Sequence, residues 1–163
     1  MRVLARLALT ASVIGAVACG EGATNAQVSL QNDFNDPQFT FNPPWTLCRT
    51  SYLGADFGQI AIGATSAAKS VTPGLDYVLM VGSWNDPSCS PAHALPIATA
   101  NKEEVVSGQT RTIVINLPNH QGPCPPEGVQ PIPQAQYDRI LQLWPEFGFK
   151  PYADRAQNPQ CGG

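Results

Sequence analysis

The chain has 163 residues, with 12 acidic and 9 basic side chains, a formal net charge of −3 and only 13 % charged residues. Two of the basic residues precede a long apolar run near the N-terminus, so the rest of the chain carries 7 − 12 = −5. An acidic chain without a Lys or Arg cluster excludes a nucleic-acid partner. Its length suits one domain with a real core rather than two.

The first 18 residues have the layout of a secretory signal peptide. Arg2 and Arg6 are followed by an eleven-residue apolar run without charge, Leu7 to Val17, and by small residues up to Cys19. The apolar run is too short for a permanent membrane span. We therefore expect residues 1–18 to direct export and to be removed.

The four residues Ala16, Val17, Ala18 and Cys19 resemble the lipobox of bacterial lipoproteins. The resemblance implies that the sulfur of Cys19 receives a diacylglycerol, so that Cys19 becomes the new N-terminus and a membrane becomes the first partner. Leucine is usual in that family where Ala16 stands here. Cleavage by an ordinary signal peptidase after Ala18 is the alternative, and it predicts a periplasmic or secreted protein instead.

The sequence has five cysteines. In an exported chain an odd number leaves one cysteine without a disulfide partner, and that leftover cysteine needs an explanation. Lipidation of Cys19 leaves four cysteines, and four can form two disulfides in an oxidising compartment. Free, buried thiols are the alternative. The four remaining cysteines are Cys48, Cys89, Cys124 and Cys161.

Residues 19–36 are predicted to be a flexible tether that lifts the domain off the membrane. The stretch from Gly20 to Asn32 is small and polar, with Val28 and Leu30 as its sizeable apolar residues. A first edge strand at Val28 to Leu30 is the alternative.

Residues 37–118 have a β pattern of short alternating segments separated by Gly and Pro. A strand is expected around Ile60 and Ile62, and a type II turn at Val71 to Gly74. The central strand should follow, with Leu75, Tyr77, Leu79 and Val81 on one face and Val78 and Met80 on the other. A Ser107-Gly108 turn then separates residues 104–106 from a last strand at 110–117, in which Ile113 and Ile115 face inward.

Two segments, VTPGLDYVLMV at 71–81 and VVSGQTRTIVINL at 105–117, resemble the small immunoglobulin-like and transthyretin-like sandwiches of envelope proteins. The resemblance implies a mainly β fold, an antiparallel immunoglobulin-like β-sandwich. The shared pattern consists of turns and strands and includes no catalytic residues, so the resemblance implies nothing about activity.

Residues 119–163 are predicted to form a Pro-rich arm with one helix packed on the sandwich. Pro133 suits the first turn, and the spacing of Tyr137, Ile140, Leu141 and Trp144 defines one helical face that ends before Pro145. Three aromatic residues beyond the helix either pin the arm to the domain, the favoured interpretation, or form a surface for a partner. They are Phe147, Phe149 and Tyr152.

Strand direction favours one disulfide pairing. If the strands before Cys89 and Cys124 run the same way in one antiparallel meander, both cysteines lie at the same end of the sheet. We therefore expect Cys89 to bond Cys124 and Cys48 to bond Cys161.

No catalytic motif, metal-binding spacing or cofactor motif occurs in the sequence. His93 and His120 lack the further ligands that copper or zinc needs, so we expect loop histidines and no metal site. We expect no enzyme, but a binding or structural module with a protein or carbohydrate partner in the envelope. Trp84 and the three arm aromatics are the candidate binding surface; a peptidoglycan-binding module and a small secreted hydrolase are the alternatives.

Overall fold

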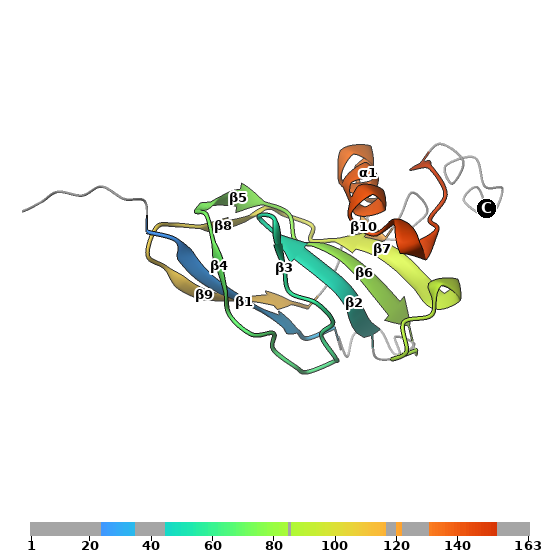
Figure 1. Cartoon of the computed structure of the whole chain (residues 1–163), viewed down its shortest axis with the longest axis horizontal. Helices are drawn as coiled ribbons and strands as arrows, with labels where there is room; N and C mark the ends of the chain where they lie inside the picture. The colour runs from blue at the N-terminus through green and yellow to red at the C-terminus, as the bar shows by residue number, and fades with distance from the viewer. Residues whose placement is uncertain (1–23, 35–44, 85, 117–119, 122–130, 153–163) are drawn as a thin grey trace, which may run out of the picture.

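The computed structural model describes residues 24–34, 45–84, 86–116, 120–121 and 131–152 (Figure 1). Most of the described residues in regular structure lie in β-strands, and one α-helix accompanies them. The mainly β prediction is therefore confirmed. The strands form a three-stranded sheet, a five-stranded sheet and a two-stranded ladder.

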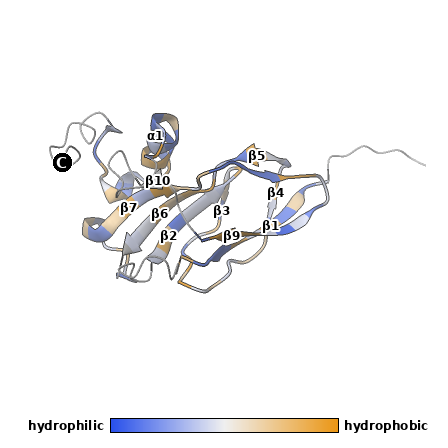
Figure 2. Ribbon diagram, turned by 180° about the vertical axis from the view of Figure 1, so that it is seen from behind, coloured by the Kyte–Doolittle hydropathy of each residue, from blue (hydrophilic) through white to orange (hydrophobic). Residues whose placement is uncertain are grey.

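The three-stranded sheet has β1 (Ala26–Asn32) in its middle, between β4 (Lys69–Val71) and β9 (Thr110–Ile115). β1 pairs antiparallel with β4 and parallel with β9. Hydrophilic and hydrophobic residues alternate along β1 (Figure 2), and every second residue from Ala26 is buried. The prediction of a flexible tether is wrong for residues 24–34, because they contain β1. The alternative of a strand at Val28 to Leu30 is correct, although the strand lies in the middle of its sheet rather than at an edge.

The five-stranded sheet has the order β10-β7-β6-β2-β3, and all of its neighbouring strands are antiparallel. β6 lies at its centre, as predicted for the central strand. β10 follows residue 118, so the sheet extends beyond the predicted end of the sandwich. The strands are β2 (Trp45–Tyr52), β3 (Ala55–Asp56), β6 (Leu79–Trp84), β7 (Ala94–Ala98) and β10 (His120–Gln121).

Two details of the predicted sandwich are corrected by the two-stranded ladder of β5 (Gly74–Asp76) and β8 (Glu103–Val105). The central strand begins at Leu79 rather than Leu75, whose side chain is 55 % exposed. Gly74 does not have the positive φ of a type II turn. It begins β5 instead, where a Cβ would lie 3.1 Å from Cδ2 of Leu53.

The first core cluster fills the space between the two larger sheets. Its members come from both sheets, from β8 and from neighbouring loops, so the sheets pack face to face as a sandwich. Ile60 belongs to it, although it forms a single bridge with Leu47 instead of the expected strand. The largest fully buried side chains of this cluster are Leu30, Phe34, Leu47, Tyr52, Ile60, Met80, Ile97 and Ile115.

The second core cluster lies on the other face of the five-stranded sheet, under α1 (Gln134–Leu143). The predicted helix is confirmed: Tyr137 and Ile140 are buried, and the 3₁₀ turn η2 (Pro145–Phe147) follows it. The sheet is thus covered on both faces. The second core cluster consists of Cys48, Leu79, Val81, Ala94, Ala98, Ile132, Tyr137, Ile140, Trp144 and Phe147.

A β-bulge in β2 determines which side chains reach each core. Leu47 pairs with Gly82 and Arg49 with Val81, so Cys48 is an extra residue without a partner on β6. Leu47 therefore points into the first core cluster and Cys48 into the second.

Gly82 is required where the sheet meets the first core cluster. A Cβ at this position would lie 2.3 Å from Cδ1 of Ile97 and 3.0 Å from the ring of Trp45. Because neighbours crowd both sides, we expect Gly82→Ala to lower the free energy of unfolding by about 1–3 kcal/mol. Urea denaturation measures this. Ala67→Val, which adds methyl groups at an exposed site, is the control, and equal losses in both variants would contradict the packing argument.

Candidate functional site

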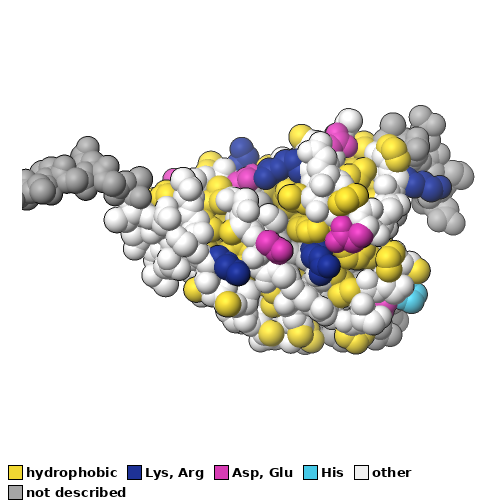
Figure 3. Space-filling model, in the orientation of Figure 1, with side chains coloured by type: hydrophobic (Ala, Val, Ile, Leu, Met, Phe, Trp, Pro, Cys, Tyr) yellow, Lys and Arg dark blue, Asp and Glu magenta, His cyan; other side chains and the backbone are white. Residues whose placement is uncertain are grey.

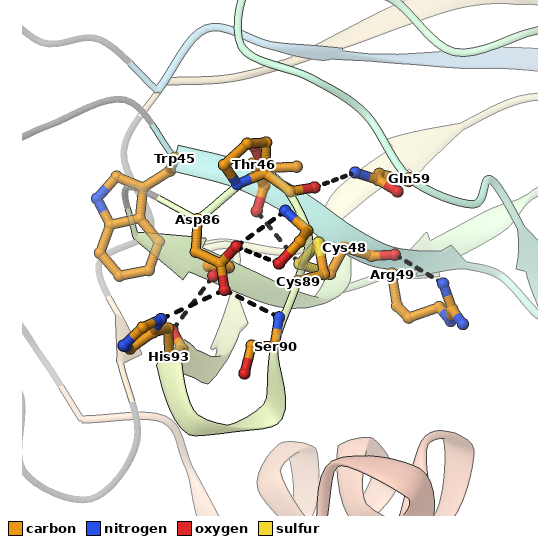
Figure 4. The surroundings of a disulfide bond; sticks show 12 residues. Trp45, Thr46, Cys48, Arg49, Gln59, Asp86, Cys89, Ser90 and His93 are labelled. Atoms are coloured by element: carbon orange, nitrogen blue, oxygen red, sulfur yellow. Dashed lines mark hydrogen bonds and ion pairs between the residues drawn. A yellow bond between two sulfur atoms is a disulfide. The ribbon is translucent and has the colours of Figure 1, made fainter.

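The loop that connects β6 to β7 is held by a disulfide. Cys48 and Cys89 are bonded, with their Cα atoms 5.7 Å apart (Figure 4). Both cysteines were predicted to form disulfides, but the predicted pairing of Cys89 with Cys124 and of Cys48 with Cys161 is wrong. Cys19, Cys124 and Cys161 lie outside the described residues.

The pairing prediction failed because its assumed meander does not exist. β9 leaves the five-stranded sheet and pairs in parallel with β1, so it does not run beside β7. The loop after β6 instead reaches its own neighbour β2, where the bulge turns Cys48 toward the helix face. Strand β2 and the loop that follows its neighbour β6, rather than two distant loops, therefore supply the sulfurs.

Asp86 organises the loop around the disulfide. Its carboxylate accepts hydrogen bonds from the hydroxyl and backbone N–H of Ser88, and from the backbone N–H of Ser90 at 3.0 Å. Nδ1 of His93 lies 3.3 Å from the same carboxylate. The Ser88 hydroxyl first, then the Ser90 amide and His93, lower the pKa of Asp86 to about 2. Cys89, with φ of 61°, sits in the left-handed region within this turn.

Other contacts join the loop to Gln59 and join β2, which carries Cys48, to the turn η2. Nε2 of Gln59 donates to the backbone oxygen of Pro87 at 3.0 Å, and a guanidinium nitrogen of Arg49 donates to the Cys48 carbonyl at 3.1 Å. Arg49 also pairs with Glu146 of η2 at 3.5 Å. The loop ends in the 3₁₀ turn η1 (Pro91–His93), whose residues are all exposed.

Acid should loosen this loop as the Asp86 carboxylate becomes protonated. The pKa of Asp86 is near 2 in the fold and about 3.9 in an unfolded chain, so its stabilising effect is complete above about pH 5. The effect is lost as the pH falls through about 2. We expect the Asp86 carboxyl to titrate near pH 2 by NMR.

The same loop gives a mutational test. Asp86→Asn should speed hydrogen exchange at the Ser88 and Ser90 amides, because an amide offers one acceptor atom where the carboxylate offers two. Asp138→Asn removes a carboxylate from α1 and should leave those rates unchanged. A titration of Asp86 near pH 4, or unchanged exchange in Asp86→Asn, would contradict the role of Asp86.

The arm aromatics pack on the domain rather than forming one open surface. Phe147 is buried and stacks on Phe149 at 5.7 Å between ring centroids. Tyr152 meets Tyr137 edge-on at 5.4 Å, and both Phe149 and Tyr152 are half-buried against the second core cluster. This corrects the proposal of a binding surface at these residues in favour of pinning. The side chain of Trp84 lies outside what the structure describes.

The polar side chains of the loop bond to groups of the loop itself and hold its conformation. Ser88 bonds to Asp86 rather than to His93, so the trio lacks the nucleophile-to-base hydrogen bond of hydrolytic triads. His93 is exposed on the loop, and the side chain of His120 is not described. Within the described ranges, no group of three or more His, Cys, Asp or Glu could hold a metal ion.

Sequence reasoning missed Asp86, although a local signal was present. Asp followed two residues later by Ser is typical of a turn in which the carboxylate caps backbone amides, and here it directly precedes Cys89. The residues of this loop that are exposed to solvent are Pro87, Ser88, Pro91, Ala92 and His93. This disulfide-held loop is therefore the best-defined candidate recognition site in the described part of the chain.

The fold and the site together describe a mainly β domain, covered by one helix and held by a buried disulfide. No family model matches this chain, and no curated protein or solved structure is significantly similar to it. Among the described residues, α1 is ten residues long, and no helix has the length and apolar character needed to cross a bilayer.

Proposed function

We propose that this chain is an exported lipoprotein of the cell envelope, whose domain is a non-catalytic binding or structural module. The observation that carries the proposal is the Cys48–Cys89 disulfide within the second core cluster. Structural disulfides persist in oxidising compartments outside the cytoplasm. The leader and the lipobox-like Ala16 to Cys19 supply the route to such a compartment.

The distribution of charge supports a protein or carbohydrate partner rather than a nucleic acid. On the face shown in Figure 3, basic and acidic side chains are interspersed and form no patch of one sign. Several basic residues are paired with acids: Arg139 with Asp76 at 2.8 Å and Arg111 with Glu103 at 2.6 Å. Such pairs leave few cations to replace the counterions of phosphate. The disulfide-held loop is the proposed recognition element.

Cell fractionation tests the proposal. The chain with its leader, expressed in a bacterium with a lipoprotein pathway, should appear in the membrane fraction and resist extraction by high salt and alkaline carbonate. Cys19→Ser removes the acceptor sulfur, so the variant should lose membrane retention while its Cys48–Cys89 disulfide still forms. Recovery of both forms in the cytoplasm with reduced thiols would overturn the proposal.

A further inference from the structure

The point where the chain enters the domain is fixed by contacts on the turn between β8 and β9. The backbone oxygen of Thr24 accepts hydrogen bonds from the Ser107 hydroxyl at 2.9 Å and from the Gly108 N–H at 3.1 Å. The hydroxyls of Thr24 and Ser107 are 2.8 Å apart. Any tether that precedes the domain therefore starts at this turn.

Two of the most exposed large apolar side chains lie beside the entry point. Leu75 and Val106 are each 55 % exposed. Leu75 pairs with Glu104 across the β5–β8 ladder, so the two share one face, and Val106 lies two residues further on. Val105, on the opposite face, is buried in the first core cluster. Leu75 and Val106 thus form an exposed apolar pair next to the turn that holds Thr24.

We infer that this end of the domain lies directly against the lipid surface that holds the anchor, with Leu75 and Val106 in contact with the membrane interface. The inference rests on the proposed lipidation of Cys19. Five residue steps separate Cys19 from Thr24, and a fully extended chain covers about 18 Å in five steps. The headgroup layer already takes up roughly 5–8 Å of that distance.

The short segment between Cys19 and Thr24 keeps the domain close to the bilayer, which favours lipid over other occupants of this surface. A tether of this length holds the apolar pair at high effective concentration beside the bilayer, so even a weak contact is populated. Side chains of this kind bind at the boundary between headgroups and acyl chains. The exposed carboxylate of Glu104, on the same face, limits the contact to that boundary rather than to the hydrocarbon interior.

The inference also gives the domain an orientation. β1 begins at one end of the molecule, whereas the connection between β6 and β7 lies at the other end (Figure 1). With the Thr24 end on the membrane, the disulfide-held loop faces away from the bilayer. It is then positioned for a partner beyond the membrane surface.

Fluorescence quenching by lipid tests this contact on the full, lipidated chain. Val106→Trp and, separately, Leu75→Trp place an indole at the proposed contact, and Leu143→Trp places one at a 45 % exposed site on α1 as the matched control. Each protein is reconstituted into vesicles of a zwitterionic lipid brominated on its upper acyl chain. The native protein, with its three Trp residues, gives the baseline.

We expect the added fluorescence at positions 106 and 75 to be lost in brominated vesicles and retained at position 143. Retention at both contact positions in lipidated, vesicle-bound protein would overturn the membrane contact while leaving the proposed function intact. Equal loss at all three positions would also overturn it. A blue shift at position 106 without vesicles, growing with protein concentration, would assign the surface to a second copy instead. Absence of lipid from the purified chain would refute the proposed function itself.

Discussion

Removing the disulfide should cost the fold about 4 kcal/mol, a large fraction of the stability of a typical domain. The estimate follows from the separation of 41 residues between Cys48 and Cys89, because a crosslink of that span restricts the unfolded chain strongly. Cys48 of β2 is fully buried in the second core cluster, so its bond also joins the β6–β7 loop to β2 beneath α1. Urea denaturation of Cys48→Ala/Cys89→Ala under oxidising conditions measures the loss.

The single variants provide the control for this prediction. A single remaining cysteine cannot crosslink the chain, so it does not reduce the entropy of the unfolded state. Cys89→Ala alone should therefore lose nearly as much stability as the double variant. Losses from Cys48→Ala and Cys89→Ala that simply add up in the double variant would show that the cysteines act as independent packed side chains. That result would contradict the role of the disulfide.

Replacing Asn32 should produce the second large effect. Its side chain is fully buried at the end of β1 and donates two hydrogen bonds of 2.9 Å, to the backbone oxygens of Trp45 and Ile60. Its Oδ1 accepts from the backbone N–H of Phe34 at 3.3 Å. The side chain thus joins the two sheets of the sandwich. Asn32→Ala removes these three hydrogen bonds, although the Ile60 carbonyl still accepts the N–H of Leu47, so at about 0.5–1.5 kcal/mol for each bond we expect a loss of about 2–4 kcal/mol.

Two further variants make the Asn32 prediction specific. Asn101→Ala changes an exposed asparagine and should alter the unfolding free energy by less than about 0.5 kcal/mol. Asn32→Asp directs a carboxylate at two carbonyl oxygens, so its pKa should rise and the variant should gain stability as the pH falls. A loss in Asn32→Asp that does not depend on pH would contradict the proposed hydrogen bonds.

Sequence patterns predicted the elements whose signals are local. The helix was defined by Pro133, by the spacing of Tyr137 and Ile140 and by Pro145, and the structure places it there. In β9 the strict alternation around Ile113 and Ile115 identified the inward face. The two faces of β6 were also assigned correctly, with Leu79 in the second core cluster and Met80 in the first.

β1 was predicted only as the alternative to a tether because its buried positions are only partly hydrophobic. Ala26 and Asn32 are fully buried but contribute little to an apolar pattern, which left Val28 and Leu30 as the visible signal. The importance of Asn32 depends on carbonyl groups that lie 13 and 28 residues away in sequence. The hydrogen-bond partners of a buried side-chain amide are set by the tertiary fold, so local sequence spacing does not reveal them.

The disulfide pairing was missed for a similar reason. A one-residue bulge decides which face Cys48 occupies, and the crossing of β9 to the other sheet removes the meander that the prediction assumed. Neither event has a periodic signature in the sequence. The Asp86-Pro87-Ser88 turn was the local signal that a structured loop lay beside Cys89.

Intact mass spectrometry of the mature protein tests the central claim most directly, that this chain is exported and anchored through Cys19. We predict a polypeptide that begins at Cys19 and carries the added mass of a diacylglycerol, and an uncleaved precursor when lipoprotein signal peptidase is inhibited. A mature chain with an unmodified start after Ala26 or at another site, or a native protein that keeps residues 1–18 and all of its thiols reduced, would contradict the account.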